Sequence, residues 1–155
     1  MIDMELYKRL SAHNEVHDPN QSKDDEEFVE IAKRALTTEV YLTSVNAMSE
    51  TGEMVNIDGT GNRVAAICYG PSTILVVAGM NKVEDTIEAA VNRARTVAAP
   101  MNKQRFPNAP TPCLVTGSCA DCKAPGSICN QMLITRRSAP AGRIKFVLVG
   151  EELGF

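Results

Sequence analysis

The chain has 155 residues, the length of one domain, and its 44% hydrophobic and 23% charged residues are ordinary for a soluble globular protein. Its formal charge of −3 excludes a general attraction to nucleic acid or anionic lipid. The N-terminus lacks the pattern of a signal peptide, and no apolar run is long enough to span a bilayer. We therefore expect a cytoplasmic protein with no nucleic-acid or membrane partner, whose cysteines stay reduced, bind metal or do redox chemistry.

The N-terminal residues 1–25 are predicted to form a polar segment ahead of an α/β domain of residues 26–155. Residues 11–25 have the composition of a loop. Four consecutive acidic residues, 24–27, then predict the start of a helix, because negative charge stabilises the positive end of the helix dipole. The first predicted strand is the β-prone run 40–43.

The next segment predicts short elements joined by turns. Residues 46–52 predict a turn with Gly52 at positive φ, and residues 54–57 predict a strand. A tight turn at residues 58–61 leads into a helix over residues 62–69, which a Gly-Pro pair ends.

The apolar run 73–78 predicts a strand that is covered on both faces, and residues 83–97 predict a helix with one apolar stripe. Strands and helices thus alternate with short connections, which favours a parallel sheet covered by helices. The helical pattern stops at residues 99–130, a Pro- and Cys-rich segment. Residues 131–135 and 144–149 are β-prone runs, and a Pro- and Ala-rich stretch between them predicts a hairpin or a wider turn.

The turn at residues 58–63, the 58–63 turn, is the first segment with chemical content. Its two glycines let the backbone approach a ligand, and the N-terminus of the following helix favours an anion. Arg63 adds a planar charge that suits carboxylate or phosphate, while Asp58 and Asn62 suit hydroxyls. The alternative is structural: Asp58 or Thr60 caps the helix, and Arg63 pairs on the surface.

The pattern therefore predicts a site for a phosphorylated or carboxylated metabolite. Two further residues, Asn46 after the first strand and Lys82 after a later one, lie at strand ends, where α/β sheets place ligands. The candidate anion-binding residues are Asn46, Asn56, Asp58, Gly59, Thr60, Gly61, Asn62, Arg63 and Lys82.

Four of the 5 cysteines form the pattern C-x5-C-x2-C-x6-C in a loop at residues 113–130, the cysteine loop. The candidate metal ligands are Cys113, Cys119, Cys122 and Cys129. Four thiolates suit a structural zinc ion. An iron–sulfur cluster also takes four thiolates, although this spacing matches neither common ferredoxin run. The remaining alternative is a loop of reduced or partly disulfide-paired cysteines.

Several motifs carry a family resemblance. Thr43-Ser44-Val45-Asn46-Ala47, the run 55–65 and the run 76–82 resemble the LUD (lactate utilization) domain. Thr111-Pro112-Cys113, Cys119-x-x-Cys122 and Ile128-Cys129 resemble its cysteine-bearing branch, and the similarity extends from about Glu27 to the end of the chain. The relatives indicated are the lactate utilization protein C group and short cysteine-bearing proteins.

The resemblance implies a parallel-sheet α/β sandwich like that of ribose-5-phosphate isomerases and CoA transferases, in which the 58–63 turn resembles the substrate-phosphate loop. Family members usually carry a further N-terminal α/β unit, which we expect to be missing here, so that either this sequence is a fragment or a partner chain covers the exposed sheet edge. Because an uncovered sheet edge invites pairing with another chain, we expect a homo-oligomer.

The resemblance also implies a role. Family members are implicated in oxidising L-lactate to pyruvate together with iron–sulfur partner proteins. The leading hypothesis is a protein that binds a small anionic metabolite, as part of L-lactate oxidation. The alternatives are an independent sugar-phosphate isomerase-like or transferase-like enzyme, and a non-catalytic, metal-stabilised assembly module. No catalytic residue is identified from the sequence, so enzymatic activity stays open.

Overall fold

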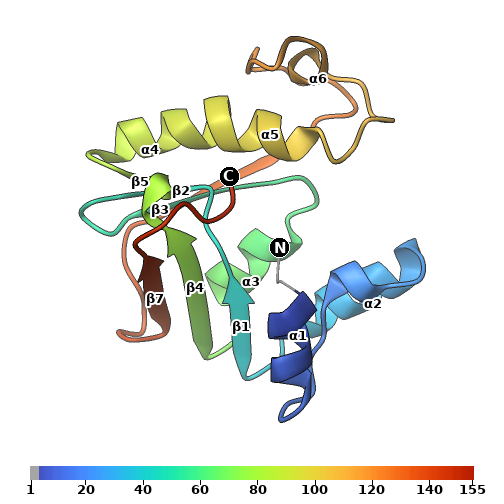
Figure 1. Cartoon of the computed structure of the whole chain (residues 1–155), viewed down its shortest axis with the longest axis vertical. Helices are drawn as coiled ribbons and strands as arrows, with labels where there is room; N and C mark the ends of the chain where they lie inside the picture. Colours follow the sequence, from blue (N-terminus) through green and yellow to red (C-terminus); the bar gives the residue numbers. More distant parts are fainter. Residues whose placement is uncertain (1–3) are drawn as a thin grey trace.

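A computed structural model describes residues 4–155, in which two sheets and a long helical segment are stacked in three layers (Figure 1). The first sheet has three parallel strands in the order β1-β4-β7. These strands are β1 (Val40–Thr43), β4 (Thr73–Gly79) and β7 (Ile144–Val149). The mixed α/β fold with a parallel sheet, predicted from the sequence, is thus confirmed.

The second sheet has four strands in the order β5-β2-β3-β6 and was not predicted. These strands are β2 (Ala47–Ser49), β3 (Met54–Asp58), β5 (Val83–Glu84) and β6 (Gln131–Thr135). The β2–β3 and β3–β6 pairs are antiparallel, whereas β2 and β5 are parallel.

Helices cover the outer face of the second sheet and flank the first (Figure 1). The α-helices are α1 (Met4–Ser11), α2 (Asp25–Arg34), α3 (Asn62–Tyr69), α4 (Ile87–Arg93), α5 (Ala99–Lys103) and α6 (Pro112–Thr116). Two 3-10 turns, η1 (Pro19–Gln21) and η2 (Met80–Lys82), and one π-helical turn, η3 (Ala94–Ala98), complete the secondary structure of the described residues. No helix in the described range is both long and apolar enough to cross a membrane.

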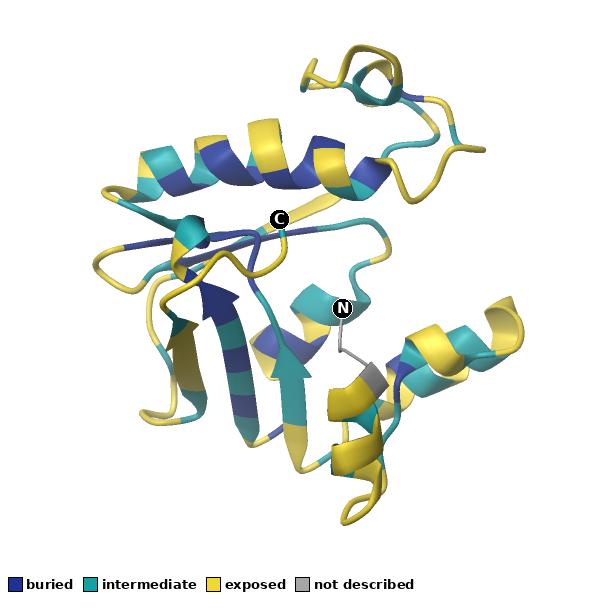
Figure 2. Ribbon diagram, viewed as in Figure 1, coloured by how far each residue is buried: buried dark blue, intermediate teal, exposed yellow. Residues whose placement is uncertain are grey.

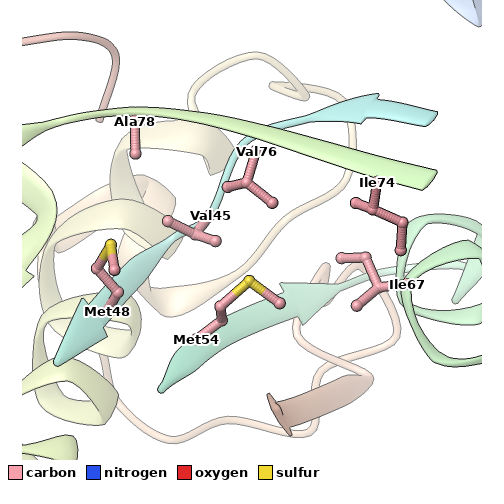
Figure 3. Packing of buried hydrophobic residues seen from close by; sticks show 7 residues of the cluster. All are labelled: Val45, Met48, Met54, Ile67, Ile74, Val76 and Ala78. Atoms are coloured by element: carbon pink, nitrogen blue, oxygen red, sulfur yellow. The ribbon is translucent and has the colours of Figure 1, made fainter. Parts of the chain in front are cut away.

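The larger core cluster lies between the two sheets. Alternate residues of β4 point into it, as expected for a strand with period 2, and α3 adds Ile67 (Figure 3). Its buried members are Val45, Met48, Met54, Ile67, Ile74, Val76 and Ala78. Figure 2 shows that β4 is the most buried strand of the first sheet, while β7 at its edge is largely exposed.

The smaller core cluster joins the other face of the second sheet to the α4–η3–α5 segment. On this face β3 contributes Val55 and Ile57, and the helical segment contributes alanines at helical spacing, Ala90, Ala94 and Ala99. Small side chains let the helix axis lie close to the sheet. Both faces of β3 are therefore covered, which places this strand at the centre of the molecule.

Several element predictions are confirmed by the structure. The strand at β1 and the helix at α3 have the predicted bounds, and α2 begins after Asp24, whose side chain accepts from the Glu27 N–H. Gly52 has a φ of 91°, as predicted. The predicted segment of residues 1–25 begins outside the described residues, and from Met4 onward it contains α1 and η1.

Two predicted boundaries are wrong. Residues 46–52 are not all turn, because β2 pairs with β3 through Ala47 and Met48. The helix predicted from residue 83 begins at Ile87, since Val83 pairs with Met48 in β2 and Thr86 Oγ1 caps the helix.

The helical segment also runs beyond its predicted end, as far as Lys103. Pro100 has no N–H and lies at the start of α5, directly after the π turn in which Ala99 N–H donates to Ala94 O. This turn carries the helix past the proline.

The stretch between β6 and β7 is not a hairpin, because the two strands belong to different sheets. The chain crosses there from the second sheet to the first. β7 is an edge strand on which Val147 and Leu148 are 45% and 46% exposed. Self-association through an uncovered sheet edge stays a prediction.

Arg143, at the start of β7, holds the C-terminal end of α3. Its guanidinium donates to the carbonyls of Pro71 at 2.9 Å, Ile67 at 2.7 Å and Ala66 at 3.1 Å. Ala66 O also accepts from Gly70 N–H at 3.0 Å, whereas the guanidinium satisfies Ile67 O, one of the last carbonyls of the helix.

We expect Arg143→Lys to lower the free energy of unfolding by about 2 kcal/mol, because an ammonium cannot donate in all three directions. Urea denaturation followed by circular dichroism measures the change. The matched control is Arg137→Lys, at an exposed position, for which no comparable loss is expected. Equal unfolding midpoints for the two variants would contradict the bracing role of Arg143.

Candidate functional site

The chain leaves the first sheet after Thr43 and enters the second at Ala47 through a crossover of residues 44–46. Asn46 in this crossover is 8% exposed. Its Oδ1 accepts from Ile57 N–H at 2.9 Å and from the Arg63 guanidinium at 3.1 Å. Its backbone N–H donates to Val55 O at 3.1 Å. Asn46 therefore fixes β3 and Arg63 against the crossover.

Two arginines from different helices converge on Asn46. Arg63 in the first turn of α3 donates to Asn46 Oδ1 and also to Ile57 O, and it lies 4.0 Å from the Asp58 carboxylate. Arg93 in the last turn of α4 donates to Asn46 O at 2.6 Å and to Asn81 O at 2.9 Å, and it lies 3.8 Å from Glu84. Burial lowers the pKa of Arg93 from its ordinary value, and Glu84 partly offsets this.

Lys82 lies at the end of η2, after the carboxyl end of β4, and is 4% exposed. Its amine donates to Ser44 Oγ at 3.1 Å and to Val45 O at 3.2 Å. Burial lowers the pKa of this amine to about 8, with further lowering by the charges of Arg93 and Arg63. Among the described residues, no carboxylate lies within ion-pair distance of it.

These three residues, Arg63, Lys82 and Arg93, form the basic cluster. Two carboxylates flank these three cations: Asp58 lies 4.0 Å from Arg63, and Glu84 lies 3.8 Å from Arg93. Both distances are close to the longest at which an ion pair is recognised. The cluster thus carries excess positive charge around a buried crossover. A buried charge without a counter-ion is unfavourable, so an anion that reaches the cluster is strongly attracted.

In the 58–63 turn the structure shows a capping role for Asp58, while anion binding by the turn stays a prediction. The Asp58 carboxylate accepts from Arg63 N–H at 3.0 Å and from Val64 N–H at 3.2 Å, so it caps α3. Thr60 and Asn62 bond to each other at the surface, with 2.7 Å between the hydroxyl and the amide oxygen. The helix N–H groups expected to meet a ligand are thus occupied by Asp58, and the structural alternative holds for this residue.

The glycines of the turn serve its shape and its contact with the cysteine loop. Gly61 has a φ of 89°, a conformation that favours glycine. A side chain on Gly59 would contact Ile128 at 3.5 Å, and one on Gly61 would contact Gln131 at the same distance.

Of the predicted anion-binding residues, Asn46, Arg63 and Lys82 come together, and Asn56 joins them. Asn56 is fully buried and donates to Ser44 O at 3.3 Å. Its Oδ1 has no hydrogen-bond partner within the described chain. A buried polar atom without a hydrogen-bond partner is rare, so the Asn56 side chain beside Ser44 has an acceptor that a ligand or water could still use.

Sequence reasoning missed Ser44, Arg93 and Tyr41. The sequence contains a signal for Arg93. This residue follows Ala90 by three positions and precedes Ala94 by one, and all three are buried at the end of α4 and the start of η3, where a charged residue is unusual. Tyr41 on β1 lies near both Arg63 and Asp58; burial raises the pKa of its phenol and the Arg63 charge lowers it.

The cysteine loop lies beside the 58–63 turn. Asn130 donates from its backbone to Asp58 O and from its side chain to Gly59 O, both at 2.9 Å. Near the middle of the loop, Asp121 pairs with Arg95 in η3. The loop is thus fastened to both the turn and the long helical segment.

The four cysteines of the loop are unpaired thiols in each other's neighbourhood. Burial raises the pKa of the Cys129 thiol, and the charges of Cys113, Cys119 and Cys122 raise it further. In the arrangement described for residues 4–155, no group of three or more His, Cys, Asp or Glu side chains is placed to hold a metal ion.

Comparison with known proteins assigns the chain to a family. The LUD domain model matches residues 2–149 of the chain. A solved structure of a DUF162 family protein from Deinococcus radiodurans matches with 13% identity and a TM-score of 0.42, over 77% of this chain. The chain spans 58% of the length of that protein. No curated protein matches the chain.

The low pKa of Lys82 predicts a stability that rises with pH. Between about pH 8 and pH 10.5 the folded protein has released the Lys82 proton while the unfolded chain still holds it. The free energy of unfolding should therefore rise across this range by up to roughly 3 kcal/mol from this residue.

Urea denaturation of the wild type and of Lys82→Met at several pH values isolates this contribution. The wild type should gain stability relative to the variant as the pH rises, and the gain should level off above about pH 10.5. A difference between the two proteins that is independent of pH would contradict a lowered pKa at Lys82.

Proposed function

The chain belongs to the LUD domain family, and we propose that it binds a small carboxylate or phosphate anion at the basic cluster. The observation that carries this proposal is the charge imbalance there: Lys82 is 4% exposed and has no carboxylate partner in the described part of the chain. The family is consistent with a lactate-utilization role, so we propose a 2-hydroxy or 2-oxo carboxylate as the ligand.

The chemistry of the cluster supports a carboxylate. A guanidinium offers two parallel N–H donors to a carboxylate, and Arg63 is the more accessible arginine, with its side chain 25% exposed. Tyr41 and Asp58, which lie near Arg63, are suited to a hydroxyl or carbonyl on the adjacent carbon. Lys82 is more deeply buried than Arg63, at 4% exposed, and its amine would supply a further cation to the ligand.

Oxidation of a 2-hydroxy acid to a 2-oxo acid releases two electrons and two protons. The proposed role therefore includes an electron acceptor, for which the family resemblance suggests iron–sulfur partner proteins. An isomerase-like or transferase-like activity on a sugar phosphate is the alternative, and it predicts a preference for phosphate compounds over 2-hydroxy acids.

Titration of the full chain with L-lactate, pyruvate and inorganic phosphate, followed by NMR chemical shifts, tests the binding. We expect shifts at Ser44, Asn46 and the Arg63 region, and an affinity for the carboxylates that falls as the pH rises through about 8, because Lys82 then loses its charge. Binding of phosphate alone would favour the alternative. No shift with any of these compounds would overturn the proposal.

The variant Asn46→Asp sharpens the test. Aspartate keeps the acceptors for Ile57 N–H and Arg63 but adds a negative charge to the cluster. We expect anion affinity to fall about tenfold while the fold is retained. The control is Thr60→Ala, on the exposed side of the 58–63 turn. The opposite pattern, with affinity lost only in Thr60→Ala, would place the anion at the turn.

We propose separately that the cysteine loop holds a zinc ion, with an iron–sulfur cluster as the alternative. The supporting observation is that the charges of three thiols act on Cys129, so all four cysteines lie within reach of one another. Binding requires the thiols to approach further, because the described arrangement does not form a coordination site.

Metal and inorganic sulfide analysis of protein purified without oxygen tests this second proposal. We expect about one zinc ion for the four cysteines, and no colour. Iron with sulfide and visible absorption would identify a cluster instead. Cys119→Ser should lose the metal, whereas Cys68→Ser on α3 should keep it. Protein without either metal would contradict the proposal.

A further inference from the structure

Two lysines are buried among the residues that the structure describes, and their surroundings differ. Lys103 is fully buried, and its amine donates to Phe106 O at 3.1 Å beside the Phe106 ring. Lys82 is 4% exposed, and its amine faces a hydroxyl, Ser44 Oγ, at 3.1 Å. Only the second amine lies in the basic cluster, at the carboxyl end of a central parallel strand, where sheets of this class bind ligands.

The reactive form of a lysine is the uncharged amine. Burial and the neighbouring arginine charges bring the pKa of Lys82 to about 8, so about a tenth of the amine is uncharged at pH 7 and about half at pH 8. An amine in such surroundings is a nucleophile towards carbonyl carbons. The arginine charges that disfavour the ammonium form of Lys82 also attract a carboxylate. A ligand with a carboxylate and a neighbouring carbonyl could therefore bind the arginines through the first group and react with the amine through the second.

We propose that the Lys82 amine forms an imine with the carbonyl carbon of a 2-oxo carboxylate whose carboxylate group is held by Arg63 and Arg93. This inference rests on the proposed function, since it uses the same anion site and names its substrate class. The residues involved come from η2, α3 and α4, and all three are tied to the crossover by the hydrogen bonds to Val45 and Asn46.

The step balances without a further reactant. The lone pair of Lys82 Nζ attacks the carbonyl carbon, and one N–H proton passes to the carbonyl oxygen to give a carbinolamine. The second N–H proton passes to the hydroxyl, the C–O bond breaks with loss of water, and the C=N bond forms. Ser44 Oγ, 3.1 Å from the amine, is positioned to exchange the proton with the departing oxygen. No group is oxidised or reduced.

The C-terminal residues 150–155 control access to this amine. A Cβ on Gly154 would lie 3.2 Å from Lys82 Nζ, so the segment passes directly over it. Both hydrogen bonds that hold it there come from one side chain: Asn81 donates to Gly154 O at 3.0 Å and accepts from Leu153 N–H at 3.1 Å. The ligand must displace this segment, and loss of the Asn81 side chain should make that easier.

Reduction with sodium borohydride in the presence of pyruvate, followed by peptide mass spectrometry of the full chain, tests the inference. We expect a reduced adduct on Lys82 that L-lactate suppresses by competition, and none on Lys103, which serves as the internal control. Adduct formation should accelerate as the pH approaches about 8 from below. Lys82→Arg keeps the charge but should lose the adduct, and Asn81→Ala should form it several-fold faster.

The outcomes separate the two proposals. Pyruvate-dependent NMR shifts at the basic cluster without an adduct on Lys82 would overturn imine formation and leave anion binding intact. An adduct only on exposed lysines, insensitive to L-lactate, would also overturn it. Absence of both shifts and adduct would overturn the proposed function itself. The wild-type measurement needs no variant, so it stands even where Lys82→Arg fails to fold.

Discussion

The fold depends on how a chain that crosses between two sheets satisfies its buried polar groups. Backbone N–H and C=O groups inside a protein need partners, and in this crossover the neighbouring strand β3 accepts from the Asn46 N–H but leaves the Val45 and Asn46 carbonyls to side chains. Residues 44–46 solve this with side chains: Asn46 bonds to β3 through its own amide, and Arg93 and Lys82 donate to the carbonyls of Asn46 and Val45. Without these donors, the carbonyls of Val45 and Asn46 would be buried between the two sheets without hydrogen-bond partners, which would destabilise the fold.

The same contacts create the candidate site. Each member of the basic cluster donates to a backbone carbonyl, so carbonyl dipoles rather than carboxylates provide most of their compensation. A carbonyl carries only a partial negative charge, which holds the cation in place without neutralising it. The requirement of the crossover for strong donors thus leaves net positive charge beside it, and the proposed anion binding rests on this charge.

Local signals in the sequence predicted local structure, whereas the site depends on distant contacts. The helix α3 was predicted because glycines precede it and Gly70 with Pro71 ends it. The strand β2 was missed because three residues are too short for periodicity and its partner lies across a turn. The approach of Arg93 to Asn46 joins residues 47 positions apart. Only its position on an alanine stripe indicated burial, and no pattern indicated its partner.

The position of the cysteine loop links the two candidate sites. Asn130 holds the carbonyls of Asp58 and Gly59, while the Asp58 carboxylate caps α3 and lies near the Arg63 guanidinium. Near the middle of the loop, Asp121 pairs with Arg95, which follows Arg93 by two residues in the same helical segment. Any rearrangement that draws the four thiols together pulls on both attachments. Because both arginines of the basic cluster lie next to an attachment, the state of the loop and the affinity of the anion site should be coupled.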